Sequence, residues 1–500
     1  MEIKRVAFLN PQGNFNPDDS YWTEHPDFGG QLVYVKEVAI AMAKEFDIEV
    51  DILTRQIRDD DWPEFSARYD SYPESNKVNI VRLPFGRYEF LNKEKLWPYL
   101  KDYVQEIQKY YEEIGEKPDI VTTHYGDGGL AGAMLEEKTG IPFTFTAHSL
   151  GAQKMDKLNV NGSNLEEMLA RYNFHLRIAA ERISMNNSAT NFVSTSQEKD
   201  SQYSHKAYAG TVNLDDETDF AVVPPGVNTD IFNPDTGPED EKIEDKFEKM
   251  LERDIDEARR SLPGVIAASR LDPKKNHLGL VKAFAGNSEL QSRTNLVITL
   301  RGIDNPFEDY SKASGDEKEI LDEIMEVIEE NDLKGKVTMF SLNSQQELAS
   351  TYRVLTAKKS VFALTAFYEP FGLAPIEAMA SGLPVVATEN GGPEEIMNDG
   401  KKHYGILVDP EDPEDISKGI LEVYLGAEGW EYYHEAGLER VKTTYTWEKT
   451  AEAYLERIKK IIENEEEFRV DKKMEIPDYF YSWKNEAELI IELQNNYFNY

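Results

Sequence analysis

Residues 5–46 read RVAFLNPQGNFNPDDSYWTEHPDFGGQLVYVKEVAIAMAKEF and contain the pattern that decides the fold. The run Arg5–Leu9 is almost entirely apolar and predicts a buried strand. A long polar loop follows and closes on Gly29-Gly30, after which Gln31–Phe46 has the pattern of a helix. A near-continuously apolar strand followed by a helix is typical of a parallel sheet covered by helices on both faces.

The same alternation continues along the chain. In the first half, further strands are expected at Glu49–Leu53, Asn79–Leu83, Ile120–Thr123, Phe143–Thr146, Asn191–Val193 and Ala221–Val223. Helical patterns lie at Lys93–Ile114, Leu130–Lys138 and Leu165–Asn186. From Gly264 the alternation starts again, with strands expected at Val265–Ser269, Leu296–Leu300, Val337–Phe340, Val361–Thr365, Val385–Ala387 and Gly405–Val408. We therefore predict an α/β protein with two Rossmann-like doubly wound domains.

The boundary between the two domains is expected near residue 226, where Pro224-Pro225-Gly226 ends a strand with residues that cannot continue it. This gives an N-terminal domain over residues 1–226 and a C-terminal domain over 227–446. An acidic stretch, Pro234–Ser261, is expected to form an exposed helical excursion. The helical segment 447–500 is expected to join the N-terminal domain.

The composition excludes several functions. The chain has 500 residues, with 55 Lys and Arg against 93 Asp and Glu, a formal net charge of −38. Binding to nucleic acid or to an anionic membrane needs a basic surface, so neither partner is expected. The absence of cysteine excludes disulfides, thiolate metal sites and cysteine nucleophiles. With no signal-like segment and no run of 18 apolar residues, we expect a cytoplasmic protein.

The two sharpest motifs follow strands of the second half. SRLDPKKN (269–276) places Arg270 and Lys275 five residues apart, and FYEPFGLAPIEA (367–378) places Glu369 and Glu377 eight apart. In open α/β sheets, ligands bind at the carboxyl ends of strands. An arginine and a lysine there can stabilise a diphosphate, whereas the alternative interpretation is a solvated basic turn. The carboxylates can accept hydroxyl groups of a sugar and of a ribose.

The first half offers weaker motifs of the same kind. Gly29-Gly30 at the start of a helix would let backbone N–H groups approach an anion. THYGDGG (123–129) and HSLG (148–151) each follow a strand and bring a histidine to its end. Two histidines at the ends of neighbouring strands indicate that they line a ligand-binding crevice. The alternative is that His148 is a core residue whose ring nitrogens are hydrogen-bonded within the protein.

In this order and at these strand ends, the motifs resemble the retaining nucleotide-sugar glycosyltransferases of the GT-B fold, in which two Rossmann-like domains face a central cleft. Together with NPQGNF (10–15) and PPGVN (224–228), they resemble more closely the sucrose-phosphate synthase family, which is related to sucrose synthase. The resemblance covers nearly the whole chain. It implies transfer of glucose from UDP-glucose, with ADP-glucose as an alternative donor, to fructose 6-phosphate with retention of configuration.

The resemblance also implies roles for individual residues. Catalytic roles are implied for His148, Arg270, Lys275 and Glu369. Donor binding is implied for Gly29, Gly30, Arg270, Lys275, Glu369, Phe371, Gly372, Leu373 and Glu377. Acceptor binding is implied for Gln31, Lys93, Tyr125, Lys154 and Arg177, with the two lysines and the arginine at the phosphate. No essential metal or other cofactor is implied, Mg²⁺ being at most stimulatory. The partners would be the two small-molecule substrates, and the chain a monomer or weak oligomer.

Some alternatives stay open at this stage. Leu176 stands where the family leads us to expect a second arginine beside Arg177, which bears on phosphate affinity. Arg177 could pair with Glu181 at i, i+4, and Lys93 could be a surface residue. The acceptor could lack a phosphate, as fructose does, or the chain could be a non-catalytic nucleotide-sugar-binding protein.

The acidity allows two interpretations, an acidic cytosolic enzyme or a protein adapted to a salt-rich cytoplasm. Self-repulsion at a net charge of −38 destabilises the compact state in dilute salt. At about 1 M salt the screening length falls to about 3 Å. If the acidity is a halophilic adaptation, the melting temperature should rise as KCl is increased from low to molar concentration. A flat or falling melting temperature would contradict the halophilic interpretation.

Overall fold

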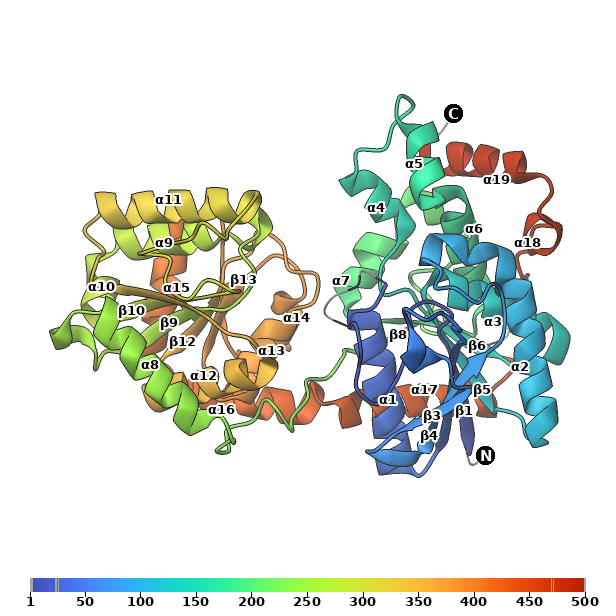
Figure 1. Ribbon diagram of the computed structural model, residues 1–500, viewed down its shortest axis with the longest axis horizontal. Helices are drawn as coiled ribbons and strands as arrows, with labels where there is room; N and C mark the ends of the chain where they lie inside the picture. The colour runs from blue at the N-terminus through green and yellow to red at the C-terminus, as the bar shows by residue number, and fades with distance from the viewer. Residues whose placement is uncertain (1–2, 23–24, 26, 469, 471, 499–500) are drawn as a thin grey trace. The chain divides into compact units, whose positions relative to one another are not determined.

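A computed structural model describes residues 3–22, 25, 27–468, 470 and 472–498 of the chain. The chain divides into two compact units (Figure 1). Unit 1 consists of Met1–Pro225 together with Trp447–Tyr500, and unit 2 consists of Gly226–Thr446. Each unit is built on its own sheet with helices on both faces, which confirms the predicted α/β class.

Unit 1 contains an eight-stranded sheet in the order β3-β4-β2-β1-β5-β6-β7-β8. Its strands are β1 (Arg5–Leu9), β2 (Glu49–Arg55), β3 (Tyr69–Tyr72), β4 (Ser75–Leu83), β5 (Ile120–His124), β6 (Phe143–Thr146), β7 (Thr190–Val193) and β8 (Phe220–Val222). Its helices are α1 (Gly30–Phe46), α2 (Leu100–Ile114), α3 (Tyr125–Thr139), α4 (Gly151–Lys157), α5 (Leu165–Tyr172), α6 (Phe174–Asn187), α7 (Ser196–Glu198), α17 (Trp447–Glu463), α18 (Tyr479–Ser482) and α19 (Glu486–Leu493). Every strand predicted in this half is present, with ends shifted by a few residues.

The sequence analysis missed one strand of this sheet, β3. It pairs antiparallel with β4 at the edge of the sheet, whereas the other pairs are parallel. Only one of its four residues, Tyr72, is buried. An edge strand exposed along most of its length lacks the apolar run by which the other strands were recognised.

Unit 2 contains a six-stranded parallel sheet in the order β11-β10-β9-β12-β13-β14. Its strands are β9 (Gly264–Ala267), β10 (Asn295–Leu300), β11 (Val337–Ser341), β12 (Val361–Leu364), β13 (Val385–Thr388) and β14 (Ile406–Val408). Numbered within the unit, this order is 3-2-1-4-5-6, that of dinucleotide-binding folds. The order reverses between β9 and β12, and in unit 1 it reverses between β1 and β5. Ligands of such sheets bind at the strand ends beside the reversal.

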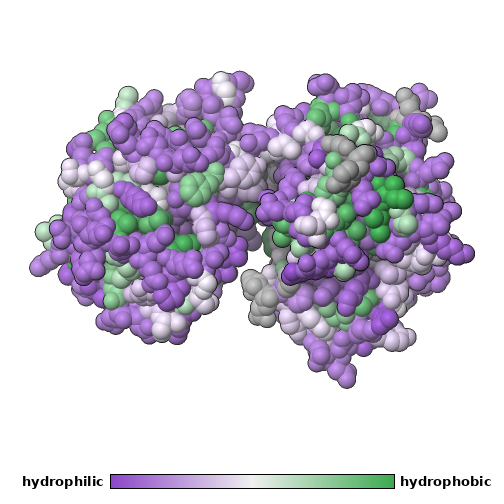
Figure 2. All heavy atoms as spheres, turned by 90° about the horizontal axis from the view of Figure 1, so that it is seen from above, coloured by the Kyte–Doolittle hydropathy of each residue, from purple (hydrophilic) through white to green (hydrophobic). Residues whose placement is uncertain are grey.

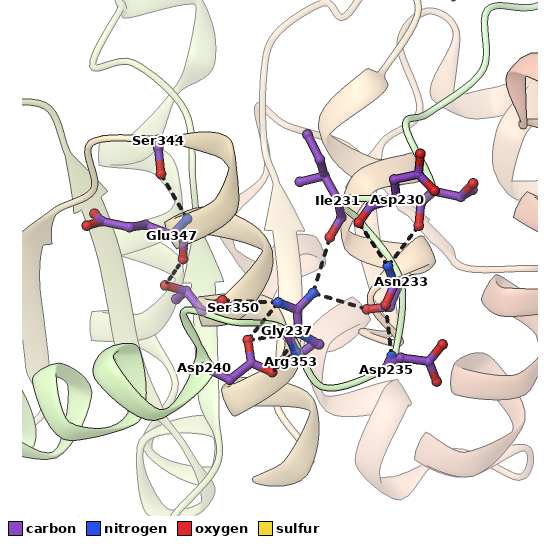
Figure 3. A network of polar contacts seen from close by, with 12 residues as sticks. Asp230, Ile231, Asn233, Asp235, Gly237, Asp240, Ser344, Glu347, Ser350 and Arg353 are labelled. Atoms are coloured by element: carbon purple, nitrogen blue, oxygen red, sulfur yellow. Dashed lines mark hydrogen bonds and ion pairs between the residues drawn. The ribbon is translucent and has the colours of Figure 1, made fainter. Parts of the chain in front are cut away.

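The helices of unit 2 include the expected acidic excursion. They are α8 (Asp240–Asp254), α9 (His277–Gly286), α10 (Ser288–Arg293), α11 (Asp316–Glu330), α12 (Gln345–Ala357), α13 (Leu373–Ala380), α14 (Pro393–Met397), α15 (Pro413–Leu425) and α16 (Gly429–Thr444). Helix α8 is not fully exposed, since Ile243, Phe247 and Leu251 are buried along one side. Arg353 of α12 holds the start of α8 in place, because its guanidinium binds Asp240 and the carbonyl oxygen of Ile231 (Figure 3).

Helix α3 begins at Tyr125, five residues before the predicted helical pattern at Leu130. The glycine-rich segment between β5 and the predicted start therefore forms the first turns of this helix. A Cβ on Gly128 would lie 2.7 Å from the carbonyl oxygen of Leu9, and one on Gly129 would lie 2.2 Å from Ser184 Oγ. These glycines therefore let α3 approach β1 and α6 closely, and the low helix propensity of glycine explains why the predicted helix began too late.

Two other predicted helices are interrupted. The pattern Leu165–Asn186 forms two helices, α5 and α6, because Asn173 between them adopts a left-handed conformation with φ 50°. The pattern Lys93–Ile114 starts with two short 3₁₀ turns, Lys93–Lys95 and Trp97–Tyr99, and α2 begins only at Leu100. Both breaks bear on the site, since they place Lys93 and Arg177 at the ends of elements and not within one long helix.

Helix α17, which follows unit 2 in the sequence, belongs to unit 1 and packs against α1 (Figure 1). Tyr454, near its middle, is fully buried and stacks on Phe192 of β7, with ring centroids 3.8 Å apart. Its hydroxyl lies 2.7 Å from Thr146 Oγ1 at the end of β6. This helix therefore completes the core behind the strand ends of unit 1.

The visible surface of the protein is largely hydrophilic (Figure 2). Among the described residues, no helix is both long enough and apolar enough to cross a membrane.

We predict that α17 contributes much of the stability of unit 1. Replacing Tyr454 with Ala should lower the free energy of unfolding of this unit by about 3–5 kcal/mol, the usual effect of removing a buried aromatic ring. Urea unfolding followed by tryptophan fluorescence measures this, because all six tryptophans except Trp430 belong to unit 1. As a control, Glu456→Ala on the exposed side of α17 should change the free energy of unfolding by less than about 0.5 kcal/mol. Equal effects of the two substitutions would contradict the prediction.

Candidate active site

The loops after β9 and β12 meet at the strand-order reversal of unit 2. The backbone N–H of Phe367 donates to the carbonyl oxygen of Lys274 at 2.9 Å, which joins the two loops. Lys275 Nζ lies 2.5 Å from Glu369 Oε2. The structure thus brings together one residue from each of the two sharpest motifs. The lysine side chain is 28% exposed and the glutamate 16%, so the pair remains accessible from outside.

Arg270 lies in the same loop as Lys275 but is exposed, and no ion pair joins it to an acidic residue in the described part of the chain. The chain contains 93 Asp and Glu residues, so an arginine at a strand end without an acidic partner indicates a position kept free for another anion. Its guanidinium is available for an anion that approaches the ends of β9 and β12.

Three glycines shape the loop that leads into α13. Gly372 has φ 111°, which favours glycine, and it immediately precedes the first residue of the helix, Leu373. A Cβ on Gly391 would lie 2.0 Å from the carbonyl oxygen of Glu369, and one on Gly392 would lie 2.1 Å from that of Phe371. The glycines therefore let the loop after β13 support the backbone between Glu369 and Leu373. The first N–H groups of α13 have no acceptor within the helix and can donate to a ligand.

Glu377 lies in the second turn of α13. Burial raises the pKa of its carboxyl group to about 7. Tyr352 is its close neighbour, and the hydroxyl of this buried tyrosine has no hydrogen-bond partner among the described residues. Hydrogen bonds from hydroxyl groups would stabilise a carboxylate in such surroundings. This is consistent with the expectation from the sequence that Glu377 binds hydroxyl groups of the donor.

In unit 1, the loop after β1 ends at Gly29 and Gly30. A Cβ on either residue would meet no atom of the described residues within 4 Å, and neither has a φ that requires glycine. Packing within the chain therefore does not explain these two glycines, whereas close approach of a ligand to the backbone would. The next residue, Gln31, is held by Asn10 and Gln12, each at 2.5 Å.

The cations predicted to bind the acceptor phosphate lie near one another. Lys93 is not a free surface residue, since its Nζ lies 2.8 Å from the buried carboxylate of Asp27. Lys154 of α4 lies over the ring of Tyr172, 4.2 Å from its centroid, and no acid pairs with it in the described part of the chain. Burial, and after it the positive charge of Arg177, lowers the pKa of the Lys154 ammonium, and Lys93 contributes in the same direction.

Arg177 does pair with Glu181, at 2.8 Å, as the alternative interpretation of its position allowed. It also donates to the carbonyl oxygen of Ser149 at 2.8 Å, and its guanidinium covers the ring of Tyr125 at 4.6 Å. Arg177 therefore contacts Tyr125, another predicted acceptor residue, and fixes the turn that follows His148. Leu176, at the position where an arginine was expected, is buried in the apolar core.

His148 lies just beyond β6 in a left-handed conformation with φ 57°. Its Nε2 is 2.8 Å from Nδ1 of His124, the last residue of β5. Burial lowers the pKa of His148 to about 3, so the imidazole is neutral at pH 7. The sequence analysis noted two histidines at neighbouring strand ends, but it did not expect them to bind each other.

No group of three or more metal-ligating side chains lies together in the described part of the chain. Of the residues that the sequence singled out, the structure brings Lys275 and Glu369 together at the reversal of strand order in unit 2. In unit 1 it brings Arg177 to the ring of Tyr125 and places Lys154 near Arg177 and Lys93.

Comparisons with known proteins identify the family and the fold of the chain. The family model of the first GT-B domain of sucrose synthase matches residues 2–254, and that of glycosyl transferases group 1 matches residues 244–440. A "Probable sucrose-phosphate synthase" of Thermosipho melanesiensis is 45% identical, over 91% of this chain and 96% of its own length. Sucrose-phosphate synthase of Spinacia oleracea is 31% identical over 91% of this chain, but the chain spans only 47% of that longer protein.

Among solved structures, sucrose-phosphate synthase from Thermosynechococcus elongatus aligns with a TM-score of 0.61. The alignment covers 92% of this chain and 99% of that one at 23% identity, which supports the fold. Similarity along nearly the whole length of the Thermosipho relative supports more than the fold. The chain is therefore a glycosyltransferase with two Rossmann-like domains of the GT-B type, and it belongs to the sucrose-phosphate synthase family.

Proposed function

We propose that this glycosyltransferase moves glucose from UDP-glucose to fructose 6-phosphate, with retention of configuration, and forms sucrose 6-phosphate and UDP. The proposal rests on membership of the family and on the two groups of residues at the strand ends. Unit 2 would hold the nucleotide sugar and unit 1 the acceptor. The reaction would take place in the cytoplasm.

The observation that carries the proposal is the cluster of Lys93, Lys154 and Arg177 in unit 1. The ammonium of Lys154 lies close enough to the other two cations for their charges to lower its pKa, and no acid pairs with it in the described residues. Assembling like charges is unfavourable unless anions neutralise them. Asp27 and Glu181 are paired with Lys93 and Arg177. Glu94 opposes the lowering of the Lys154 pKa, but it forms no ion pair with Lys154 among the described residues, so a further anion would have to neutralise this ammonium. A sugar phosphate with about two negative charges would do so, whereas free fructose would not.

On the donor side, we propose that Arg270 and Lys275 neutralise the diphosphate as it leaves. Departure of UDP leaves negative charge on the oxygen that bridged to the glucose. A guanidinium and an ammonium fixed beside that oxygen stabilise it more as the bond breaks than before. We expect turnover without an added divalent cation, because these two side chains carry the charge that a metal would otherwise supply.

The proposed roles of Glu369 and Glu377 follow from their surroundings. Glu369 is paired with Lys275 and would bind a glucose hydroxyl with its other oxygen, beside the backbone of Phe371–Leu373. Glu377, with a raised pKa, would bind the ribose diol. A double displacement with retention would need a nucleophilic carboxylate on the side of the sugar opposite the leaving diphosphate. We instead propose attack of the acceptor on the same face that the diphosphate leaves, with His148 beside the reacting carbon.

A second acceptor, free fructose, is the alternative within the same family of reactions. Turnover of UDP-glucose and ADP-glucose with fructose 6-phosphate, compared with fructose, distinguishes the two acceptors and the two donors. A preference for fructose would contradict the proposed acceptor and leave the donor site unaffected.

We predict that Lys275→Ala or Arg270→Ala lowers kcat by a factor on the order of 10²–10³, the usual effect of removing one group that stabilises developing charge. The KM for fructose 6-phosphate should change little. Lys274→Ala is the matched control, because Lys274 is an exposed neighbour in the same loop. Steady-state kinetics with UDP-glucose and fructose 6-phosphate measures kcat and KM for each variant. A kcat within a few-fold of the parent value for Lys275→Ala and Arg270→Ala would exclude their role at the leaving group.

We predict that Lys154→Ala weakens the apparent affinity for fructose 6-phosphate by about 10- to 100-fold. A charge-assisted hydrogen bond contributes about 1.5–3 kcal/mol, and 1.4 kcal/mol corresponds to a factor of ten. UDP-glucose binding should hardly change. Lys157→Ala, at the exposed end of the same helix, is the control.

Arg177→Ala should also weaken fructose 6-phosphate binding, but it would leave the buried carboxylate of Glu181 without its cation. Such a loss typically destabilises a protein by about 3–5 kcal/mol. Lys154→Ala is therefore the cleaner measurement. If it retained the parent's preference for fructose 6-phosphate over fructose, the phosphate would have to bind elsewhere.

A further inference from the structure

His124 lies directly behind His148 in the core of unit 1. It is the last residue of β5 and is fully buried, with its ring stacked on Phe8 at 5.4 Å between centroids. On its other side, its ring centroid is 5.1 Å from that of His148, with an angle of 28° between the planes. The edge of His148 is packed by Tyr34, whose ring centroid is 5.1 Å away. Aromatic rings on two sides therefore fix the orientation of both imidazoles.

The backbone at His148 needs this support. The N–H of Ser149 donates to the carbonyl oxygen of Ala147 at 2.6 Å, so His148 is the central residue of a three-residue turn. With φ 57°, this is the rare and strained form of that turn. A non-glycine residue held in this conformation costs about 1–3 kcal/mol and occurs most often at functional sites. The strain requires that neighbouring contacts hold the residue in place.

The hydrogen bond between the two rings restricts where their protons lie. Burial lowers the pKa of both histidines, for His124 with the help of its neighbour, so each ring is neutral and carries one N–H. Only one of the two facing nitrogens, His124 Nδ1 and His148 Nε2, can carry the proton that they share. The position of that proton determines the tautomer of both rings.

The interior of the protein favours one of the two arrangements. His124 Nε2 is buried and has no hydrogen-bond partner among the described residues. If His148 donated the shared proton, the single proton of His124 would lie on this Nε2 and be buried without an acceptor. If His124 donates, only a lone pair is left there. In backbone groups, where this has been surveyed, a buried N–H without a partner is rarer than an under-satisfied acceptor.

We propose that His124 is a positioning residue, whose Nδ1–H donates to His148 Nε2 and thereby holds His148 in the tautomer with its proton on Nδ1. His148 is only half-buried, and its Nδ1 has no hydrogen-bond partner among the described residues. The free Nδ1–H is then a neutral, preoriented donor for an oxygen of the transferred sugar. This inference rests on the proposed function, in which His148 lies beside the reacting carbon.

The tautomer can be measured directly by ¹⁵N NMR of the full chain labelled at histidine, with His148→Gln used to assign the signals. We expect His148 to show a protonated-type shift at Nδ1 and an unprotonated-type shift at Nε2. The reverse pattern would overturn the proposal. This measurement needs no turnover, so it decides the tautomer even if the acceptor proves not to be fructose 6-phosphate.

Kinetics tests the consequence for the reaction. His124→Phe retains a ring to stack on Phe8 but loses the donor, and it should lower kcat by about 10- to 100-fold with both KM values within about threefold. His124→Asn places an N–H near the position of Nδ1 and should recover most of that loss. Thr144→Val, which removes a buried hydrogen bond to Thr122 in the same two strands, is the control and should leave kcat unchanged.

The outcomes separate this proposal from the function on which it rests. A kcat unchanged in His124→Phe would overturn the positioning role, as would a loss equal in the Phe and Asn variants. If His148→Ala itself kept full activity, the proposed place of His148 in the reaction would be wrong, whatever the nitrogen shifts show. If His124→Phe failed to fold, the tautomer of the parent and the activity of His124→Asn would still test the proposal.

Discussion

The arrangement of this protein depends on one constraint, the reversal of strand order within each parallel sheet. At the reversal, the loops from two adjacent strands leave in opposite directions, and the space between them is open to a ligand. In unit 2 these are β9 and β12, which supply Lys275 and Glu369. In unit 1 they are β1 and β5, which lead to Gly29 and His124. Residues far apart in sequence therefore meet because hydrogen bonding sets the order of the strands.

A single buried carboxylate organises the polar part of unit 1. Glu181 accepts hydrogen bonds from Arg177, from the backbone N–H of Gly151 and from the hydroxyl of Tyr208. Arg177 in turn holds the carbonyl oxygen of Ser149, next to His148. The strained turn, the start of α4 and Arg177, a cation of the proposed acceptor site, thus share one support. Because these charges are buried, salt screens them far less than it screens the acidic surface.

Alternating apolar runs were enough to predict both sheets, because buried parallel strands differ strongly in composition from the loops between them. The same reasoning was less accurate where one amino-acid composition fits more than one local structure. The glycines after His124 weakened the helical pattern, so the start of α3 was placed five residues too late, although these glycines permit close packing of the helix. The partner of Lys93 could not be predicted, because Asp27 meets it only through the fold. The i, i+4 spacing, by contrast, already allowed the pair of Arg177 and Glu181. The bond between the two histidines depends on strand register, which the sequence does not state.

The return of α17 to unit 1 has a consequence for the order in which the protein forms during synthesis. Unit 2 is continuous in sequence and can complete its sheet while the rest of the chain is still being made. Unit 1 begins first but ends last, since the side chain that stacks on Phe192 is Tyr454. Until that residue leaves the ribosome, the strands of unit 1 lack part of their core. The amino-terminal half is thus the last part of the chain that can complete its core, although its synthesis begins first.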